Sequence, residues 1–276
     1  MRLLENSTFP LTLQCTFSGM EGEDSFLQLL ELLSSYGFYG VEVNVKDLSA
    51  ISPDSLMKRI RSFGLHMTYL ATGVYANTRG YSLSSASPDR RRESVAGCRE
   101  NIQYAAECGC GIIIGFFKNT PAVDTVTPEL YFEESLRELA PLARRLHVPI
   151  LLEATNHYES RIANSLEQAA DLAGRIDPSI ITVLPDTYHM NIEESSPLEA
   201  LAACGMNFPN IHFSDNNRFF PGFGFIPFEK YAAKLNDMHY EGTIGIEGNL
   251  KYSYEQDLEH TASYLANILC RAPQRI

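Results

Sequence analysis

The sequence predicts a (β/α)₈ barrel, an α/β fold in which eight parallel strands alternate with helices and close into a cylinder. Short apolar runs alternate with longer amphipathic stretches along the chain, and together they form eight strand–helix pairs. The apolar runs are nearly continuous, as parallel strands covered on both faces must be. The length of 276 residues also fits, because such barrels typically take about 250 residues. We therefore expect a single domain over residues 1–276.

The segments that lead into several strands reuse one glycine-containing pattern. It occurs at Tyr36–Glu42, Cys108–Ile112 and His239–Ile244. An internal echo of this kind is expected of a repeated strand–helix unit. An open doubly wound sheet is the structural alternative, but its Gly-x-Gly-x-x-Gly turn after the first strand is absent.

The first half of the chain carries clear start and stop signals for its helices. Apolar residues recur at helical spacing within Asp24–Tyr36, and Gly37 then ends the helix. Ser52 caps the next helix and Pro53 opens it, while Gly109 ends the long third helix. The predicted strands are Leu11–Phe17, Gly40–Val45, His66–Thr72 and Gly111–Phe117, and the long third helix covers Ser87–Cys108.

The second half repeats the scheme, beginning with a helix that follows Thr127-Pro128 and runs to Leu146. Its apolar runs again have the length of strands, and its amphipathic stretches have the length of helices. The predicted strands are Pro149–Thr155, Ile181–Thr187, Asn210–Asp215 and Thr243–Gly248. The predicted helices are Ser165–Ile176, Ser196–Cys204, Pro227–Met238 and Tyr254–Cys270.

Four consecutive strands of the second half each place a polar side chain near their carboxyl end. These are Glu153, Asp186, His212 and Glu247, with spacings of 33 (186 − 153), 26 (212 − 186) and 35 (247 − 212) residues. Each spacing is about one strand–helix unit, so the four side chains are expected at the same rim of the barrel. Catalytic groups of this fold come from that rim. Taken singly, each residue fits a rim position in water equally well.

A divalent metal ion explains the four residues together. Three carboxylates gathered in a buried place would repel one another and their pKa values would rise. A bound cation removes that cost. Three oxygen ligands with one imidazole suit Mn²⁺, Co²⁺ or Mg²⁺, and we expect one ion, with Mn²⁺ as the first choice and Zn²⁺ as a further alternative.

Four longer stretches of the second half resemble a known family. The stretches are Ile150–Glu153 with Asn156–Glu159, Asp186–Glu194, His212–Arg218 with Pro221–Gly224, and Tyr240–Gly242 leading to Glu247. They are similar to the xylose-isomerase-like barrels, and most closely to the ketose 3-epimerases, such as D-tagatose and D-psicose 3-epimerase, and the related sugar-phosphate isomerases and epimerases. The resemblance covers nearly all of the second half.

The resemblance implies roles for seven residues. It places the metal on Glu153, Asp186, His212 and Glu247, and it makes Glu153 and Glu247 the catalytic carboxylates. It also implies that Glu159, His189 and Arg218 contact the oxygens of the substrate. Each of these three has a structural alternative: a solvated loop glutamate, a histidine bonded to backbone, and an arginine paired with Asp215 or another acid of the rim.

The implied activity is a divalent-metal-dependent epimerisation or isomerisation of a sugar by proton transfer next to a carbonyl, through an enediolate. Aldose–ketose isomerisation of the hydroxypyruvate or xylose isomerase type is one alternative, and elimination by a lyase is another. A non-catalytic sugar-binding relative and an apurinic endonuclease similar to endonuclease IV complete the alternatives. We expect a small sugar as substrate and, by analogy with the fold, a homodimer or homotetramer.

The charge and hydropathy of the sequence argue against two classes of binding partner, nucleic acids and membranes. The formal net charge of −12 is the opposite of the basic surface that nucleic-acid binding requires, so the sequence predicts no nucleic-acid partner. Apolar runs are shorter than a membrane span needs, and Met1–Glu5 shows no signal-peptide hydrophobic stretch. We therefore expect a cytoplasmic protein without a membrane partner, whose six cysteines are buried or partly buried thiols.

Overall fold

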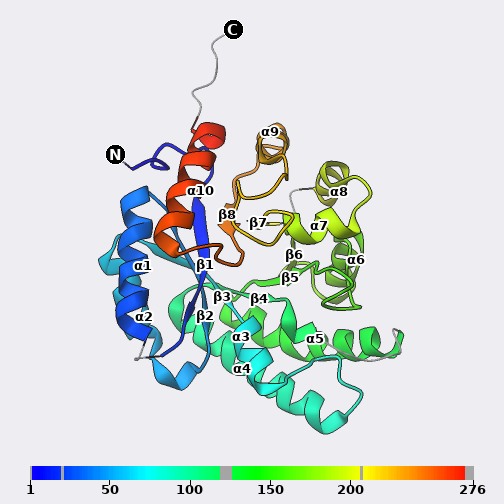
Figure 1. The fold of residues 1–276 in the computed structure, drawn as a ribbon. Coiled ribbons are helices and arrows are strands. Elements are labelled where there is room, and N and C mark those ends of the chain that lie inside the picture. Colours follow the sequence, from blue (N-terminus) through cyan, green and yellow to red (C-terminus); the bar gives the residue numbers. More distant parts are fainter. Residues whose placement is uncertain (1, 20–21, 119–125, 206–207, 271–276) are drawn as a thin grey trace.

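The computed structural model describes residues 2–19, 22–118, 126–205 and 208–270, and it shows a ring of eight parallel strands surrounded by helices (Figure 1). This is the predicted (β/α)₈ barrel. The strands are β1 (Leu11–Phe17), β2 (Gly40–Val45), β3 (His66–Ala71), β4 (Gly111–Ile114), β5 (Ile150–Glu153), β6 (Ile181–Leu184), β7 (Asn210–Phe213) and β8 (Thr243–Ile246).

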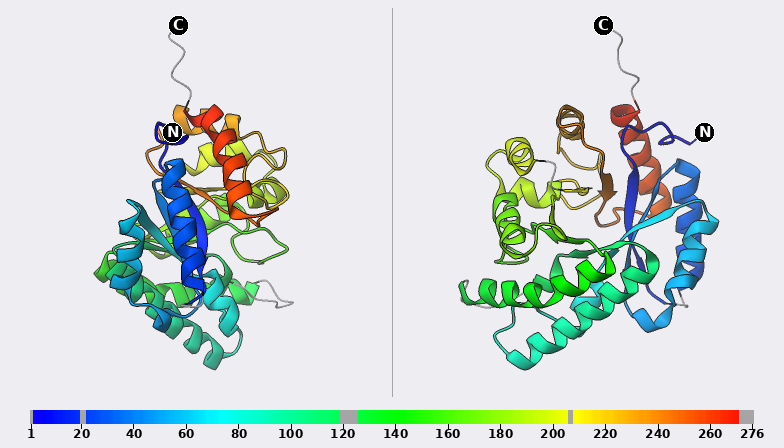
Figure 2. Two further views of the ribbon diagram at one scale, coloured as in Figure 1. Left: turned by 60° about the vertical axis from the view of Figure 1, so that its left-hand side comes forward. Right: turned by 180° about the vertical axis from the view of Figure 1, so that it is seen from behind.

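Helices connect successive strands along the outside of the ring, as the two turned views show (Figure 2). In the part of the first half that the structure describes, the helices are α1 (Glu23–Tyr36), the 3₁₀ turn η2 (Leu48–Ala50), α2 (Pro53–Ser62), α3 (Gly73–Arg79), α4 (Pro88–Cys108) and the 3₁₀ turn η3 (Phe116–Lys118). Those of the second half are α5 (Val126–Leu146), α6 (Leu166–Ile176), α7 (Thr187–Glu193), α8 (Pro197–Cys204), α9 (Phe228–Asp237) and α10 (Tyr254–Leu269). None of the helices in the described part of the chain is both long and apolar enough to cross a membrane.

The strands follow one another in chain order around the ring, with β1 beside β8. Ladders of parallel hydrogen bonds join every neighbouring pair except β6 and β7. There the ring closes through a single bridge between Asp186 and His212, and the His212 N–H donates to the carbonyl oxygen of Pro185 at 2.8 Å. The junction between β6 and β7, which a single bridge closes, therefore carries two of the four predicted metal ligands.

Local sequence signals set the ends of most helices. Ser52 and Ser165 accept hydrogen bonds from the first turns of α2 and α6, and Gln168 completes a capping box with Ser165. Gly37 and Gly109 end α1 and α4 with φ of 88° and 73°, a left-handed conformation that glycine adopts at low cost. These boundaries agree with the sequence predictions.

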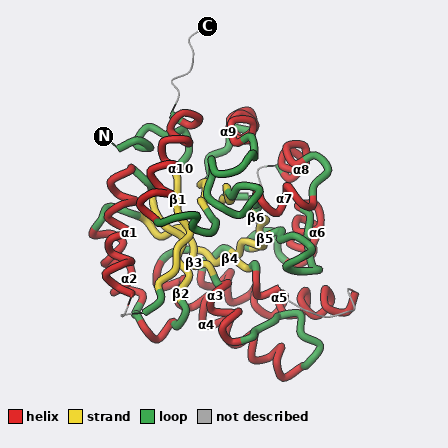
Figure 3. Tube along the Cα trace, in the orientation of Figure 1, coloured by secondary structure: helices red, strands yellow, loops and turns green. Residues whose placement is uncertain are grey.

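The structure corrects the predicted carboxyl ends of several strands. We predicted that the fourth strand reaches Phe117 and the sixth Thr187, whereas β4 ends at Ile114 and β6 at Leu184. The following residues form the short helices η3 and α7, which the sequence did not predict. In α7 the cause is local, because the Asp186 side chain accepts the N–H groups of Tyr188 and His189 and so starts a helix. Figure 3 shows the short helix α7 in red beside β6.

The apolar core has two parts. The larger part fills the space between the strands and the outer helices, and a small cluster lies inside the barrel. The inner cluster consists of Tyr69, Ala71, Ile113, Leu151 and Leu184. All six cysteines are free thiols, four of them buried and two partly buried, as predicted.

Candidate metal and substrate site

The four predicted ligands come together at the carboxyl ends of the last four strands. Glu153 is the last residue of β5, Asp186 lies two residues beyond β6, His212 belongs to β7 and Glu247 follows β8 directly. One ligand atom from each lies within 4.8 Å of the others. Asp186 and His212 are fully buried and Glu153 is nearly so. The four side chains therefore lie together at one rim of the barrel, as their spacing in the sequence predicted.

Three of these side chains keep a buried polar atom without a hydrogen-bond partner in the described part of the chain. The atoms are Oε1 of Glu153, Nδ1 of His212 and Oε2 of Glu247. Nδ1 lies 2.7 Å from Oε2 of Glu247 without hydrogen-bond geometry, and 3.8 Å from Oε1 of Glu153 and from Oδ2 of Asp186. A buried polar atom left unpaired costs about 1–3 kcal/mol. Because a divalent cation among these atoms would satisfy all of them, the donor set fits such an ion.

Glu42 on β2 fixes the orientation of His212. Its Oε2 lies 2.8 Å from Nε2 of His212, and its Oε1 accepts hydrogen bonds from Thr12 (3.0 Å) and Asn210 (2.8 Å). The carboxylate therefore holds the Nε2 proton and turns Nδ1 toward the cluster, as carboxylates behind metal-bound histidines do. This residue was not predicted from the sequence. The signal that marks it is a charged side chain inside a short strand, Gly40–Val45, whose other residues are uncharged.

Two glycines leave room for this arrangement. A Cβ atom at Gly245 would lie 2.4 Å from Oε1 of Glu42 and 2.8 Å from Cδ2 of His212. A Cβ atom at Gly115 would lie 2.2 Å from Oε2 of Glu153. Any larger residue at either position would displace a side chain of the cluster.

The carboxylates of the cluster shift the pKa of His212, and the pKa of Glu247 is in turn shifted by Arg218 and His212. Burial favours the neutral form of His212, but the carboxylates of Glu42 and Glu247 outweigh it and raise the pKa of the imidazole well above its usual value. Burial also works against ionised Glu247, but Arg218 and His212 hold the pKa of this carboxyl well below its usual range. The site therefore favours positive charge at its centre, which a cation would supply.

Arg218 occupies the rim beside the cluster. Its Nη1 lies 2.6 Å from Oδ2 of Asp186, and its Nη2 lies 2.9 Å from Oε1 of Glu247. Of the structural alternative for Arg218, the pair with Asp215 does not form, because Asp215 accepts the N–H groups of the Gly222–Ile226 loop, whereas pairing with other acids of the rim is observed. Arg218 thus carries its charge next to two of the candidate metal ligands.

His189 and Glu159 also line the pocket beside the candidate metal ligands. The His189 Nδ1 accepts the backbone N–H of Asn156 at 3.2 Å, so in the neutral ring Nε2 carries the proton. That Nε2 lies 3.6 Å from Oε1 of Glu153. Glu159 is half-buried, contacts the Asn156 side-chain amide at 3.4 Å and lines the pocket, so it is not simply a solvated loop residue. The roles of these two residues toward a substrate remain predictions.

A fully buried lysine, which the sequence analysis gave no role, supports this side of the site. The Lys118 Nζ donates to the carbonyl oxygens of Glu153 (2.5 Å), Ile162 (3.1 Å) and Ala163 (3.4 Å). Burial lowers the pKa of Lys118 to about 7, against the opposing effect of Glu153 and Glu159. Lys118 therefore ties the end of β5 to the loop that follows it.

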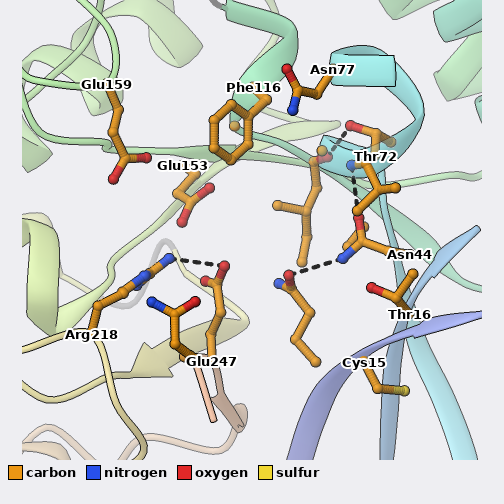
Figure 4. Close-up of a pocket in the computed structure, with 18 of the residues that line it drawn as sticks. Cys15, Thr16, Asn44, Thr72, Asn77, Phe116, Glu153, Glu159, Arg218 and Glu247 are labelled. Atoms are coloured by element: carbon orange, nitrogen blue, oxygen red, sulfur yellow. Dashed lines mark hydrogen bonds and ion pairs between the residues drawn. The ribbon is translucent and has the colours of Figure 1, made fainter. Parts of the chain in front are cut away.

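The side chains line a cavity of about 430 Å³ at the mouth of the barrel. Figure 4 shows Glu153, Glu159, Arg218 and Glu247 on one side of it, and Asn44, Thr16 and Cys15 on the other. A cavity of this size is within the range of small-molecule sites. The two walls differ in chemistry, since one is ionic and the other is neutral and polar.

The fold and the candidate site agree with the family to which a comparison with known proteins assigns the chain. A family model described as a xylose isomerase-like TIM barrel matches residues 30–267. The chain belongs to this family. The resemblance inferred from the motifs of the second half is thereby confirmed, and proteins similar to this chain include two D-psicose 3-epimerases and a probable ketose 3-epimerase.

Two relatives and one solved structure are similar to this chain over most of its length. The D-psicose 3-epimerase of Enterocloster bolteae is 24% identical over 229 residues, which cover 80% of this chain and 76% of the relative. The 3-dehydro-D-guloside 4-epimerase of Escherichia coli is 26% identical over 238 residues, 83% of this chain and 88% of the relative. The crystal structure of D-psicose 3-epimerase with D-tagatose from Clostridium cellulolyticum H10 has a TM-score of 0.79 at 21% identity, and the match covers 95% of this chain and all of that one. At this identity the structural match establishes the fold.

Proposed function

We propose that this protein is a divalent-metal-dependent sugar epimerase that inverts a carbon next to the carbonyl of a ketose or keto-sugar through an enediolate. The observation that carries the proposal is the pair of unpaired carboxylate oxygens, on Glu153 and Glu247, that face one cavity beside Nδ1 of His212. The relatives named above support the reaction class, since both are sugar epimerases. They differ in the carbon that they invert, and the proposal covers both positions.

Glu153, Asp186, His212 and Glu247 would hold the ion. Mn²⁺ is our first choice over Co²⁺, Mg²⁺ and Zn²⁺, because three carboxylates with one imidazole form a mostly oxygen site. When bound, the ion would supply Lewis-acid polarisation of the substrate carbonyl, which lowers the free energy of the enediolate.

The two glutamates, Glu153 on β5 and Glu247 after β8, would transfer the protons. They belong to the first and the last of the four strands that carry the candidate ligands. Inversion requires a base on one face of the carbon and an acid on the other, whereas a single group tends to return the proton to the same face. Acid–base catalysis by such groups typically contributes about 10²–10⁴-fold to the rate. The first glutamate removes the proton as a carboxylate, and the second returns one as a carboxylic acid.

The remaining polar groups of the ionic wall position the substrate. Nε2–H of His189 and the guanidinium of Arg218 would donate hydrogen bonds to oxygens on which negative charge develops. Glu159 would accept a hydrogen bond from a substrate hydroxyl. All three side chains line the cavity, and Arg218 is held in place by Asp186 and Glu247.

The proposal is tested by NMR of a sugar panel in D₂O with Mn²⁺, Co²⁺ or Mg²⁺ added to the protein. The panel contains D-psicose, D-tagatose, D-fructose and L-ribulose. We expect deuterium to enter at least one sugar at the carbon next to the carbonyl, together with its epimer. Deuterium in an aldose product would instead indicate an aldose–ketose isomerase. Binding of sugars without any deuterium incorporation would indicate a non-catalytic sugar-binding protein and contradict the proposal.

A further inference from the structure

The neutral wall of the cavity is built from the inward faces of β1 and β2. Gln14 on β1 and Asn44 on β2 both line the cavity, and the parallel register places Gln14 beside Glu42 and Thr16 beside Asn44. One layer deeper, Thr12 and Glu42 support His212. The same two strands therefore hold the metal-site histidine from behind and form the wall that faces the ionic side (Figure 4).

A chain of hydrogen bonds fixes the direction of the Gln14 amide. The backbone N–H of Val74 can only donate, and it lies 3.2 Å from the Asn44 Oδ1. The other end of the Asn44 amide must therefore be its NH₂ group, which donates to Oε1 of Gln14 at 3.0 Å. With its oxygen used in this way, Gln14 keeps its own NH₂ group free. That group has no hydrogen-bond partner in the described part of the chain.

We propose that Gln14 is a specificity-determining residue, whose amide NH₂ donates a hydrogen bond to an oxygen on the part of the sugar that lies away from the reacting carbonyl. This inference rests on the proposed function, because the ionic wall sets which end of the sugar reacts. A glutamine already oriented by Asn44 loses little conformational freedom when it binds, so its hydrogen bond contributes more to affinity.

The charge of the neutral wall indicates what that part of the sugar is. The polar side chains on this side of the cavity include Gln14, Thr16 and Asn44, together with Thr72 and Asn77 from the adjoining segment at α3, and all of them are uncharged. Among the described residues that line the cavity, Arg218 is the only arginine or lysine, and it is already paired with two carboxylates. Recognition of a phosphate usually relies on cationic side chains or on several backbone N–H groups. The far end of the substrate is therefore an uncharged polyol chain or ring and carries no phosphate.

The test compares two variants with wild type in their binding of matched sugars. Isothermal titration of Mn²⁺-loaded protein measures the affinity for D-psicose and for its 4-, 5- and 6-deoxy derivatives. We expect at least one deoxy derivative to bind wild type about 3- to 10-fold more weakly than D-psicose, which is the effect of one neutral hydrogen bond. The same derivative and D-psicose should bind Gln14→Met equally well.

Gln14→Leu is the second variant, because its side chain is branched and less flexible than methionine and offers a sugar hydroxyl neither a donor nor an acceptor. It should lose the same discrimination. Gln103→Met, at an exposed position of α4, is the matched control and should discriminate as wild type does.

Three results would contradict the inference in different ways. Undiminished discrimination in both Gln14 variants would overturn it and leave the epimerase proposal intact. Tighter binding of D-psicose 6-phosphate than of D-psicose would overturn the assignment of an uncharged far end. Failure of wild type to bind any sugar of the panel would overturn both this inference and the proposed function.

Discussion

Two glutamates of the candidate metal site differ from a buried aspartate at the opposite end of the barrel in how their oxygens are paired. At the amino end of β6, Asp177 is 6% exposed and both of its oxygens are paired, one with the backbone and hydroxyl of Ser179 and the other with Arg144. At the carboxyl ends of the strands, Glu153 and Glu247 each keep an oxygen without a hydrogen-bond partner in the part of the chain that the structure describes. Pairing stabilises the fold, whereas unpaired buried oxygens are costly unless something else binds them. The comparison indicates that one end serves stability and the other serves a ligand.

The largest expected effect concerns the two unpaired glutamates. Glu153→Gln and Glu247→Gln should each lower the rate of solvent deuterium incorporation by at least about 100-fold, because each removes a proton-transfer group. The rate is measured by NMR on the best sugar of the panel. Glu241→Gln, an exposed change near the start of β8, is the control. Substantial activity in both single variants would refute the roles of the two carboxylates.

Metal should stabilise the carboxyl end and, through it, the whole fold. At a free Mn²⁺ concentration of roughly 100 times Kd, binding to the folded protein alone would raise the free energy of unfolding by about 2.7 kcal/mol. Denaturant unfolding with and without Mn²⁺ measures this change. The same increase in a Glu153→Gln/Glu247→Gln double variant would place the ion somewhere else.

Glu42 lies on β2, the strand that carries Asn44 of the neutral wall, and it contacts His212 of the metal site. Replacing Glu42 should therefore weaken metal binding directly. Glu42→Gln should weaken Mn²⁺ binding by about 10- to 100-fold, because a partner behind a metal-bound histidine fixes its orientation and basicity. Calorimetric titration with Mn²⁺ gives the affinity, and Glu107→Gln on the exposed side of α4 is the matched control. Unchanged affinity would show that Glu42 serves packing alone.

The smallest effect on activity is expected at the opposite end. Asp177→Asn should lower the free energy of unfolding by about 1–2 kcal/mol and leave deuterium incorporation unchanged. Ser179 and Arg144 lower the pKa of Asp177 against a smaller effect of burial. Stability from this group is therefore present above the usual pKa of an aspartate and is lost as the pH falls through the lowered value. The exposed Asp171→Asn is the control, since the Asp171 side chain is 74% exposed and lies 3.2 Å from Arg175 on the same helix.

The sequence predicted the barrel and the ligand set because both depend on periodic patterns. Strand length, helix caps and the spacing of about one strand–helix unit are properties of local sequence, and the rim is where equivalent strand ends meet. The short helix α7 was missed because Asp186 was interpreted only as a candidate ligand, whereas its side chain also caps the helix.

Other features depend on contacts between distant segments, and a single sequence does not reveal them. Glu42 and His212 are 170 residues apart, and the direction of the Gln14 amide depends on a backbone N–H of α3. Arg218 could be assigned to the rim from its motif, but its choice of Asp186 and Glu247 over Asp215 follows from the Gly222–Ile226 loop, which occupies Asp215. Such choices are made by the assembled fold.

The central claim is that the last four strands bind one cation jointly. A crystal structure of the protein grown with Mn²⁺, with anomalous diffraction recorded near the manganese edge, tests this claim directly. We predict one strong anomalous peak bound by Glu153, Asp186, His212 and Glu247. A cavity without a manganese peak, with the same side chains bonded only to one another, would contradict the claim.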